Sequence, residues 1–235
     1  MNATVDPARS LADLVIERES RGDILEKFGL DFCCGGRKSL RDACRDSKTS
    51  LPDVVRALER NDATPPPAAA VVDWRKAPLR DLMDHIVGTH HVYLRHALPA
   101  LQMKVDKVAQ VHGERHSEIW EVREIFSKLK MELETHLAKE EDIVFPAIRR
   151  MEAGVPLPES AMCELEDEHK KVGDSLHAIR RITNSYRAPA DACPTYRAML
   201  SGLAALEADT HHHVHKENNV LLPRARGAAR KSAGR

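Results

Sequence analysis

The stretch Leu133–Ala147, LETHLAKEEDIVFPA, decides the fold, because it sets ionisable residues in the middle of an apolar helical stripe. The stripe repeats at spacings of three and four residues, the period of an amphipathic helix. Its apolar members are Val122, Phe126, Leu129, Leu133, Val144 and Ala147. His136 and Glu140 occupy the positions between Leu133 and Val144. We therefore expect this helix to point an imidazole and a carboxylate, one turn apart, into a protein core.

Three more helical patterns are interrupted in the same way. Met162, Leu165, Val172, Leu176 and Ile179 form a stripe whose remaining position is His169. Farther on, Leu203, Leu206, Val220 and Leu221 flank His213 and Glu217. The earliest pattern has Leu79 and Leu82, then His85 beside Ile86. Here His90, His91 and His96 compete with His85, and spacing alone favours His85 only through its apolar neighbours.

The four patterns predict an all-α protein. We expect helices at about 76–110 with a kink at Pro99, at 116–150, at 159–186, and from Pro189 or Pro194 to about Leu222. Short connections between long helices favour an up-down-up-down four-helix bundle. Aromatic residues make up only 4% of the chain, which disfavours a β-sandwich.

Polar residues on four core stripes require a compensating partner, because burying ionisable groups alone costs several kcal/mol each. The unit His-x-x-x-Glu occurs at His136–Glu140 and at His213–Glu217, and His85 and His169 add single imidazoles. Four imidazoles and two carboxylates are more ligands than one tetrahedral zinc ion takes. They suit two ions, each with two histidines, bridged by both glutamates. Iron or manganese accepts such ligands, and iron is our choice. The alternative is a structural bundle whose histidines bind nothing.

Several other histidines have no assigned role. His211, His212 and His215 crowd around His213; we expect His211 and His215 to face solvent or to support the ligands. His112, His116 and His177 look like surface residues.

The chain divides at the prolines of TPPPAAA, residues 64–70, which favour an extended spacer. We expect a small helical domain at 1–62, a linker at 63–74, the bundle at 75–223 and a basic, disordered tail at 224–235. In the small domain, Ser10, Ser39 and Ser50 are candidate helix caps, and Gly29 ends a helix. Sixty residues bury little core, so this domain is expected to lean on a partner or to form a homodimer.

Charge and hydropathy exclude some functions. Lys plus Arg equals Asp plus Glu at 36 each, so nothing indicates binding to nucleic acid or to an anionic membrane. There is no apolar run of about 20 residues and no secretory signal, so we expect a cytoplasmic protein. Five cysteines, an odd number, do not suggest a disulfide framework.

Cys33 and Cys34 lie in the loop DFCCGG, residues 31–36. Adjacent cysteines rarely pair with each other. A nearby helix N-terminus would favour their thiolates, which could bind iron, take up nitrosyl groups or exchange disulfides. The alternative is a pair of inert apolar side chains. Cys44, Cys163 and Cys193 are interpreted as packing residues.

These segments together resemble the iron–sulfur cluster repair di-iron proteins. The bundle is similar to a hemerythrin-like domain through LMDHI at 82–86, HLAKEE at 136–141, Glu168-His169 and His213-x-x-x-Glu217-Asn218-Asn219. DFCCGG is similar to the signature of that family's N-terminal domain. The resemblance implies iron ligation by His85, His136, Glu140, His169, His213 and Glu217, with both glutamates bridging two Fe ions.

The resemblance also implies a function. It is repair of iron–sulfur clusters damaged by nitric oxide or oxidative stress, through iron donation or denitrosylation, with damaged or apo iron–sulfur proteins and nitric oxide as partners. One alternative is a di-iron protein that binds nitric oxide, or an enzyme that reduces it. Another is an oxygen or redox sensor.

Overall fold

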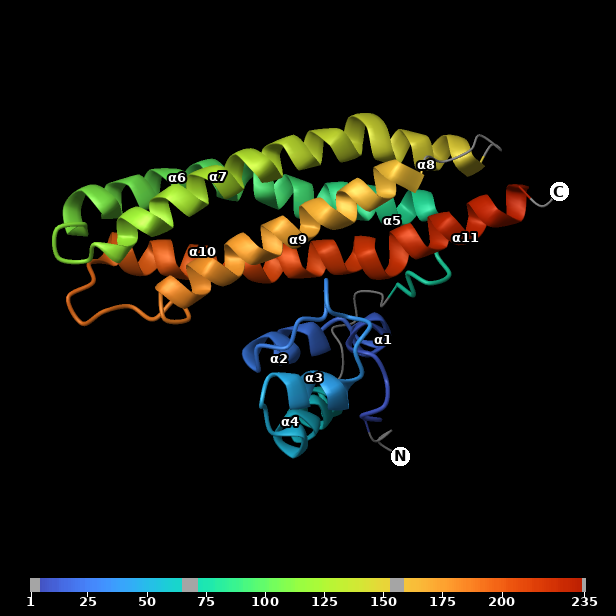
Figure 1. The fold of residues 1–235 in the computed structure, drawn as a ribbon, viewed down its shortest axis with the longest axis horizontal. Coiled ribbons are helices and arrows are strands. Elements are labelled where there is room, and N and C mark those ends of the chain that lie inside the picture. Colours follow the sequence, from blue (N-terminus) through green and yellow to red (C-terminus); the bar gives the residue numbers. More distant parts are fainter. Residues whose placement is uncertain (1–4, 65–71, 153–158, 234–235) are drawn as a thin grey trace. The chain divides into compact units, whose positions relative to one another are not determined.

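The computed structural model describes residues 5–64, 72–152 and 159–233. Within these ranges every regular element is a helix, apart from one antiparallel bridge between Ser10 and Ser39 (Figure 1). The predicted all-α class is confirmed. The chain forms two compact units: Met83–Thr210, and Met1–Leu82 together with His211–Arg235.

The unit Met83–Thr210 is built from four long helical lines. They comprise α5 (Leu79–Ile86), η1 (Val87–His91) and α6 (Val92–His112); α7 (Glu118–Lys139), η2 (Glu140–Val144) and α8 (Phe145–Glu152); α9 (Glu159–Ile182); and α10 (Pro194–Lys216). Figure 1 shows α7 lying along α6 and along α9, as short connections between antiparallel helices require. The chain continues from α10 into η3 (Glu217–Leu221) and α11 (Leu222–Ala233). The predicted four-helix bundle is confirmed, and α6 runs through Pro99 without ending.

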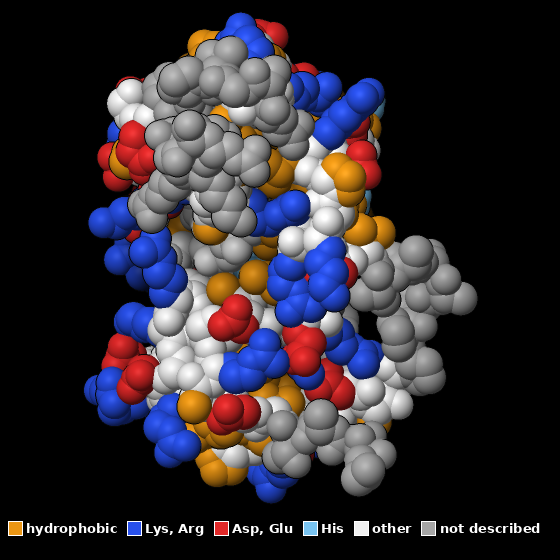
Figure 2. Space-filling view, turned by 90° about the vertical axis from the view of Figure 1, so that its right-hand side faces the viewer, with side chains coloured by type: hydrophobic (Ala, Val, Ile, Leu, Met, Phe, Trp, Pro, Cys, Tyr) orange, Lys and Arg blue, Asp and Glu red, His pale blue; other side chains and the backbone are white. Residues whose placement is uncertain are grey.

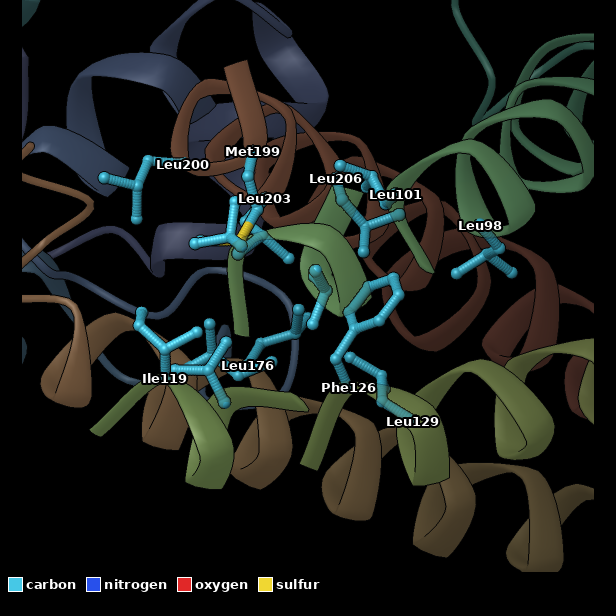
Figure 3. Packing of buried hydrophobic residues seen from close by; sticks show 14 of the residues in the cluster. Leu98, Leu101, Ile119, Phe126, Leu129, Leu176, Met199, Leu200, Leu203 and Leu206 are labelled. Carbon is cyan, nitrogen blue, oxygen red and sulfur yellow. The ribbon is translucent and has the colours of Figure 1, made fainter. Parts of the chain in front are cut away.

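Apolar side chains from all four lines make the core of this unit (Figure 3). Phe126 and Leu129 on α7 belong to one cluster with Leu176 on α9 and Leu206 on α10, and all four are at most 1% exposed. Burial of each such side chain stabilises the fold by about 1.5–3 kcal/mol. This apolar core holds the helices at the spacing that brings their polar residues together.

Three of the helical lines contain a π-helical turn of five residues: Val87–His91, Glu140–Val144 and Glu217–Leu221. A π turn accommodates one additional residue and is frequent at functional sites. Each of these turns begins or ends on a buried histidine or glutamate, namely His91, Glu140 or Glu217. The apolar periodicity of the sequence did not predict them.

The N-terminal part of the second unit consists of four short helices, as predicted. They are α1 (Leu11–Glu17), α2 (Arg21–Lys27), α3 (Leu40–Asp46) and α4 (Leu51–Ala63). Ser10 and Ser39 accept hydrogen bonds from the backbone N–H groups of Asp13 and Asp42, which confirms these caps. Gly29, with φ at +67°, ends the turn after α2. Leu25, Leu40 and Leu58 lie at the centre of a small apolar core.

The C-terminal segment of this unit supplies the contacts that the small helices need. His211 Nδ1 lies 3.1 Å from Glu26 Oε2, and His212 Nε2 lies 3.0 Å from Asp23 Oδ1. His215 Nδ1 lies 3.1 Å from the Phe32 carbonyl oxygen. The extra histidines therefore hold the small helices, and the expectation that His211 and His215 face solvent or support metal ligands is corrected.

The predicted tail at 224–235 is also corrected, because α11 extends to Ala233. Pro223 is the second residue of α11 and directly follows the π turn η3. Arg224 donates hydrogen bonds to the backbone carbonyls of Trp74 and Ala77, at 2.5 and 2.6 Å. Most of the predicted linker, residues 65–71, lies outside the described residues.

The face shown in Figure 2 mixes Lys and Arg with Asp and Glu side chains, in keeping with the balanced charge of the sequence. Among the described residues, none of the helices combines the length and apolar character that a membrane span requires.

Candidate metal centre

His136 is a polar residue of the bundle core, and both of its ring nitrogens have a contact. It lies on α7 and is 3% exposed. Its Nδ1 is 2.8 Å from Glu168 Oε2, and its Nε2 is 3.1 Å from His169 Nε2 on α9. The Glu168 carboxylate can only accept, so Nδ1 carries the proton and Nε2 presents a lone pair. His136 and His169 therefore direct ring nitrogens to the same place.

Glu140, the first residue of the π turn η2, lies between two imidazoles from different helices. Its Oε1 is 3.3 Å from His136 Nε2, and its Oε2 is 3.3 Å from His91 Nε2. Glu140 and His91 are both 0% exposed. The donor atoms of His136, Glu140 and His169 all lie within 4.8 Å of one another. A carboxylate placed in this way can bridge two cations.

The structure favours His91, rather than the predicted His85, as the histidine of the first helical line. His85 is half-buried, and its Nδ1 lies 3.4 Å from the Thr89 hydroxyl. The π turn Val87–His91 adds a residue after Ile86, so His91 takes the inward position that regular periodicity assigns to His90. His90 is also buried, with its Nδ1 2.9 Å from Asp209 Oδ1, and His96 is exposed.

Carboxylates stand behind two of these imidazoles. His91 Nδ1 is 2.6 Å from Glu141 Oε1, and Glu168 stands behind His136. The hydrogen bond from His136 and a second from Lys139 lower the pKa of Glu168 to about 2. Burial opposes ionisation of Glu141, but hydrogen bonds from His91 and Arg95 leave its pKa lowered. Histidines that bind metals commonly have such a carboxylate on the other ring nitrogen.

This donor set fits a metal. Imidazole lone pairs and a carboxylate converge in a volume from which water is excluded, and a cation compensates the desolvation of such groups. Nitrogen and oxygen donors suit iron, manganese or zinc. The carboxylates behind His91 and His136 fix the tautomers that leave Nε2 available.

The other compact unit holds the second His-x-x-x-Glu pair. His213 Nε2 is 3.2 Å from Glu217 Oε1, and both residues are 1% exposed. Glu217 begins the π turn η3, as Glu140 begins η2. The two pairs therefore have the same local geometry: a histidine at the end of an α-helix and a glutamate that opens a π turn.

The Cys33–Cys34 loop is organised by Asp31. Its Oδ1 accepts from the backbone N–H groups of Cys33 and Cys34 at 2.9 Å, and its Oδ2 accepts from Gly35 N–H at 2.8 Å. The two sulfur atoms lie 3.8 Å apart as free thiols, Cys33 buried and Cys34 exposed. Contact with the Cys34 thiol, burial and the negative charge of Asp31 raise the pKa of Cys33 well above its ordinary value. The raised pKa disfavours the thiolate form of Cys33, and the expected thiolate at this position stays a prediction.

Comparison with known families defines the class of protein. Residues 82–225 match the family described as Hemerythrin HHE cation binding domain, and residues 7–62 match the Domain of Unknown function (DUF542). The chain belongs to the hemerythrin-like cation-binding family. The family match and the buried cluster of histidines with Glu140 together indicate that the bundle binds a metal such as iron.

Individual relatives of the chain define a narrower group within this family. The chain is 35% identical over 216 residues to the Iron-sulfur cluster repair protein YtfE of Escherichia coli O1:K1 / APEC, covering 92% of this chain and 95% of that protein. The YtfE protein of Escherichia fergusonii gives the same values, and that of Escherichia coli O81 (strain ED1a) is 34% identical with the same coverage. The resemblance to the iron–sulfur cluster repair proteins is confirmed.

Proposed function

We propose that this protein uses a pair of iron ions to take part in the repair of iron–sulfur clusters damaged by nitric oxide or oxidative stress in the cytoplasm. The single observation that supports it most is Glu140, whose two carboxylate oxygens face His136 and His91 at 3.3 Å each in a fully buried position. A bridging carboxylate between histidines from two helices is what a di-iron centre in a helical bundle requires. The names of the relatives supply the repair role.

The proposed ligands are His91, His136, Glu140, His169, His213 and Glu217, with His91 in the place first given to His85. The inclusion of His213 and Glu217 rests on their pattern in the sequence and on the family match, which runs from residue 82 to residue 225. Four imidazoles and two carboxylates are enough for two irons and too many for one. The count of two irons, both glutamate bridges and the six-residue set are proposals.

The residues of this chain would prepare the centre in two ways. Glu141 and Glu168 orient the imidazoles of His91 and His136. The apolar core keeps bulk water away from the donors, which strengthens their interaction with a cation. When bound, a pair of ferrous ions supplies open coordination positions and two reducing electrons for a small molecule such as nitric oxide. As cargo, iron leaving the centre would be supplied to an apo-cluster protein.

The thiols of the Cys33–Cys34 loop are proposed to react with partner proteins or nitrosyl groups during repair. Cys34 is exposed and Cys33 is buried, so Cys34 is the sulfur that a partner protein or nitrosyl group meets first. Homodimer formation and nitric oxide binding stay predictions.

Metal analysis tests the centre. Full-length protein should contain about two irons per chain, and His136→Ala and His91→Ala should each lose iron. His85→Ala is the matched control on the same helical line and should keep its iron. Equal iron in the His91 and His85 variants would remove His91 from the ligand set.

A parallel assay tests the role. Iron-loaded protein is mixed with a nitric oxide-damaged iron–sulfur enzyme, and reactivation is followed together with nitrous oxide release. Reactivation by the wild type, lost in His136→Ala, supports repair. Nitrous oxide without reactivation would refute repair in favour of nitric oxide reduction.

A further inference from the structure

A second group of polar residues lies at the opposite end of α6 from His91, about 30 Å along the helix axis. It consists of His112, His116, Asp191, Cys193 and Tyr196, all within the unit Met83–Thr210. The sequence interpretation placed His112 on the surface and Cys193 among packing residues. In the structure His112 is 4% exposed, and its Nε2 lies 3.2 Å from Cys193 Sγ.

We propose that Cys193 and His112 form a reactive thiol–imidazole pair, and that Cys193 is a site of reversible mixed-disulfide formation with small disulfides of the glutathione disulfide class. An imidazole within hydrogen-bond distance of a thiol can accept its proton as the sulfur attacks. Neither residue belongs to the proposed iron centre.

Cys193 lies at the start of a long helix. Cys193 directly precedes α10, and its carbonyl accepts a hydrogen bond from Arg197 N–H at 3.0 Å in the first turn of that helix. The N-terminus of a helix stabilises an anion placed there. Backbone bonding fixes the approach to the helix, because Ala192 N–H donates to the Pro189 carbonyl at 3.1 Å. Cys193 is half-buried and packs against the apolar core of this unit.

The His112 ring is committed to this thiol. Among the described residues its Nδ1 has no hydrogen-bond partner, so the contact with Cys193 is the hydrogen bond that the ring makes. The Tyr196 ring packs against it, with centroids 5.3 Å apart. The nearby acidic groups are held by another histidine: His116 Nε2 is 3.0 Å from Asp191 Oδ1, and its Nδ1 is 3.3 Å from Glu118 Oε1.

The proposed step is thiol–disulfide exchange and is balanced in atoms and electrons. Cys193 Sγ attacks one sulfur of the small disulfide, and a new S–S bond forms while the original S–S bond breaks. His112 Nε2 takes the thiol proton and returns it to the departing thiolate, which leaves as a free thiol. The small disulfide is the oxidant.

The chain contains its own reference thiol. Cys163 on α9 is exposed, whereas Cys193 is only half-buried, so exposure alone would make Cys163 the faster thiol. Full-length, iron-loaded protein is incubated with glutathione disulfide, and adducts at each cysteine are followed over time by peptide mass spectrometry. General-base assistance of about tenfold or more should make Cys193 react faster than Cys163.

Two variants test whether His112 causes the faster reaction of Cys193. His112→Gln should remove the advantage of Cys193, whereas His116→Gln, the matched control, should keep it. If circular dichroism shows that His112→Gln does not fold, His112→Asn and the wild-type ratio of the two rates decide. A wild-type Cys193 rate at or below that of Cys163, or an advantage that survives loss of His112 in a folded variant, overturns the proposal.

Discussion

Glu168 tests whether the carboxylates behind the proposed ligands control the centre. It accepts hydrogen bonds from His136 Nδ1 at 2.8 Å and from Lys139 Nζ at 2.9 Å. In Glu168→Gln a neutral amide oxygen still accepts from the imidazole, so the geometry is retained and the charge is lost. A charge-assisted hydrogen bond contributes about 1.5–3 kcal/mol and a neutral one about 0.5–1.5 kcal/mol.

The difference of about 1–1.5 kcal/mol is reduced by solvent, because the Glu168 side chain is 34% exposed. We therefore expect iron affinity to fall about three- to fivefold, below the about 10- to 100-fold range known for residues that support metal ligands. The measurement is anaerobic competition for ferrous iron between the protein and a chromogenic chelator.

Glu164→Gln is the matched control. Glu164 accepts a hydrogen bond from the same Lys139 at 2.9 Å, and its side chain is 62% exposed. This variant removes the same charge from the same helix one turn away. If both variants bind iron with equal affinity, the support of His136 by Glu168 is refuted. An equal loss of iron affinity in both would then come from the removal of a negative charge near the site.

Three further outcomes are expected. In the metal-free protein, the pKa of Glu168 lies at about 2 instead of its ordinary 4.5. Its contribution to stability is therefore present above pH 4.5 and is lost as the pH falls toward 2, which urea unfolding at several pH values should show for the wild type and not for Glu168→Gln. Phe126→Ala should lower the free energy of unfolding by about 3–5 kcal/mol, because Phe126 is fully buried, whereas Met131→Ala at a position 62% exposed should change it by less than about 0.5 kcal/mol; similar effects would contradict the described core. Asp31→Asn should lower the pKa of the Cys33 thiol, since a nearby negative charge is removed, while burial keeps it above the ordinary value. Site-resolved alkylation against pH measures this, and an unchanged or raised pKa would contradict the role given to Asp31.

Much of the fold could be predicted from sequence because its signals are local. Apolar spacing places Phe126 and Leu129 on one helical face, and the caps Ser10 and Ser39 mark where helices begin. The histidine–glutamate spacing at His136 and Glu140 likewise depends on one helix only. The structure places these as predicted.

The remaining features depend on contacts between elements or on backbone irregularities. Glu168 supports His136 across two helices, and no spacing in the sequence relates residues 32 positions apart. Asp31 carried a usable signal, since Asp often accepts from backbone N–H groups shortly after it. The sequence favoured His85 because apolar residues flank it, and the π turn that brings His91 inward leaves no signal in the apolar spacing.

The three π turns mean that the length of a helix, as well as its composition, encodes this centre. Removing one residue from Val87–His91 would restore a regular α-helix and rotate everything beyond the deletion by about 100° relative to the preceding segment. Substitution scanning never samples such a change. Single-residue deletions are usually avoided inside helices. Here such a deletion would turn the donors of one helical line away from the core without substituting any of the donor residues.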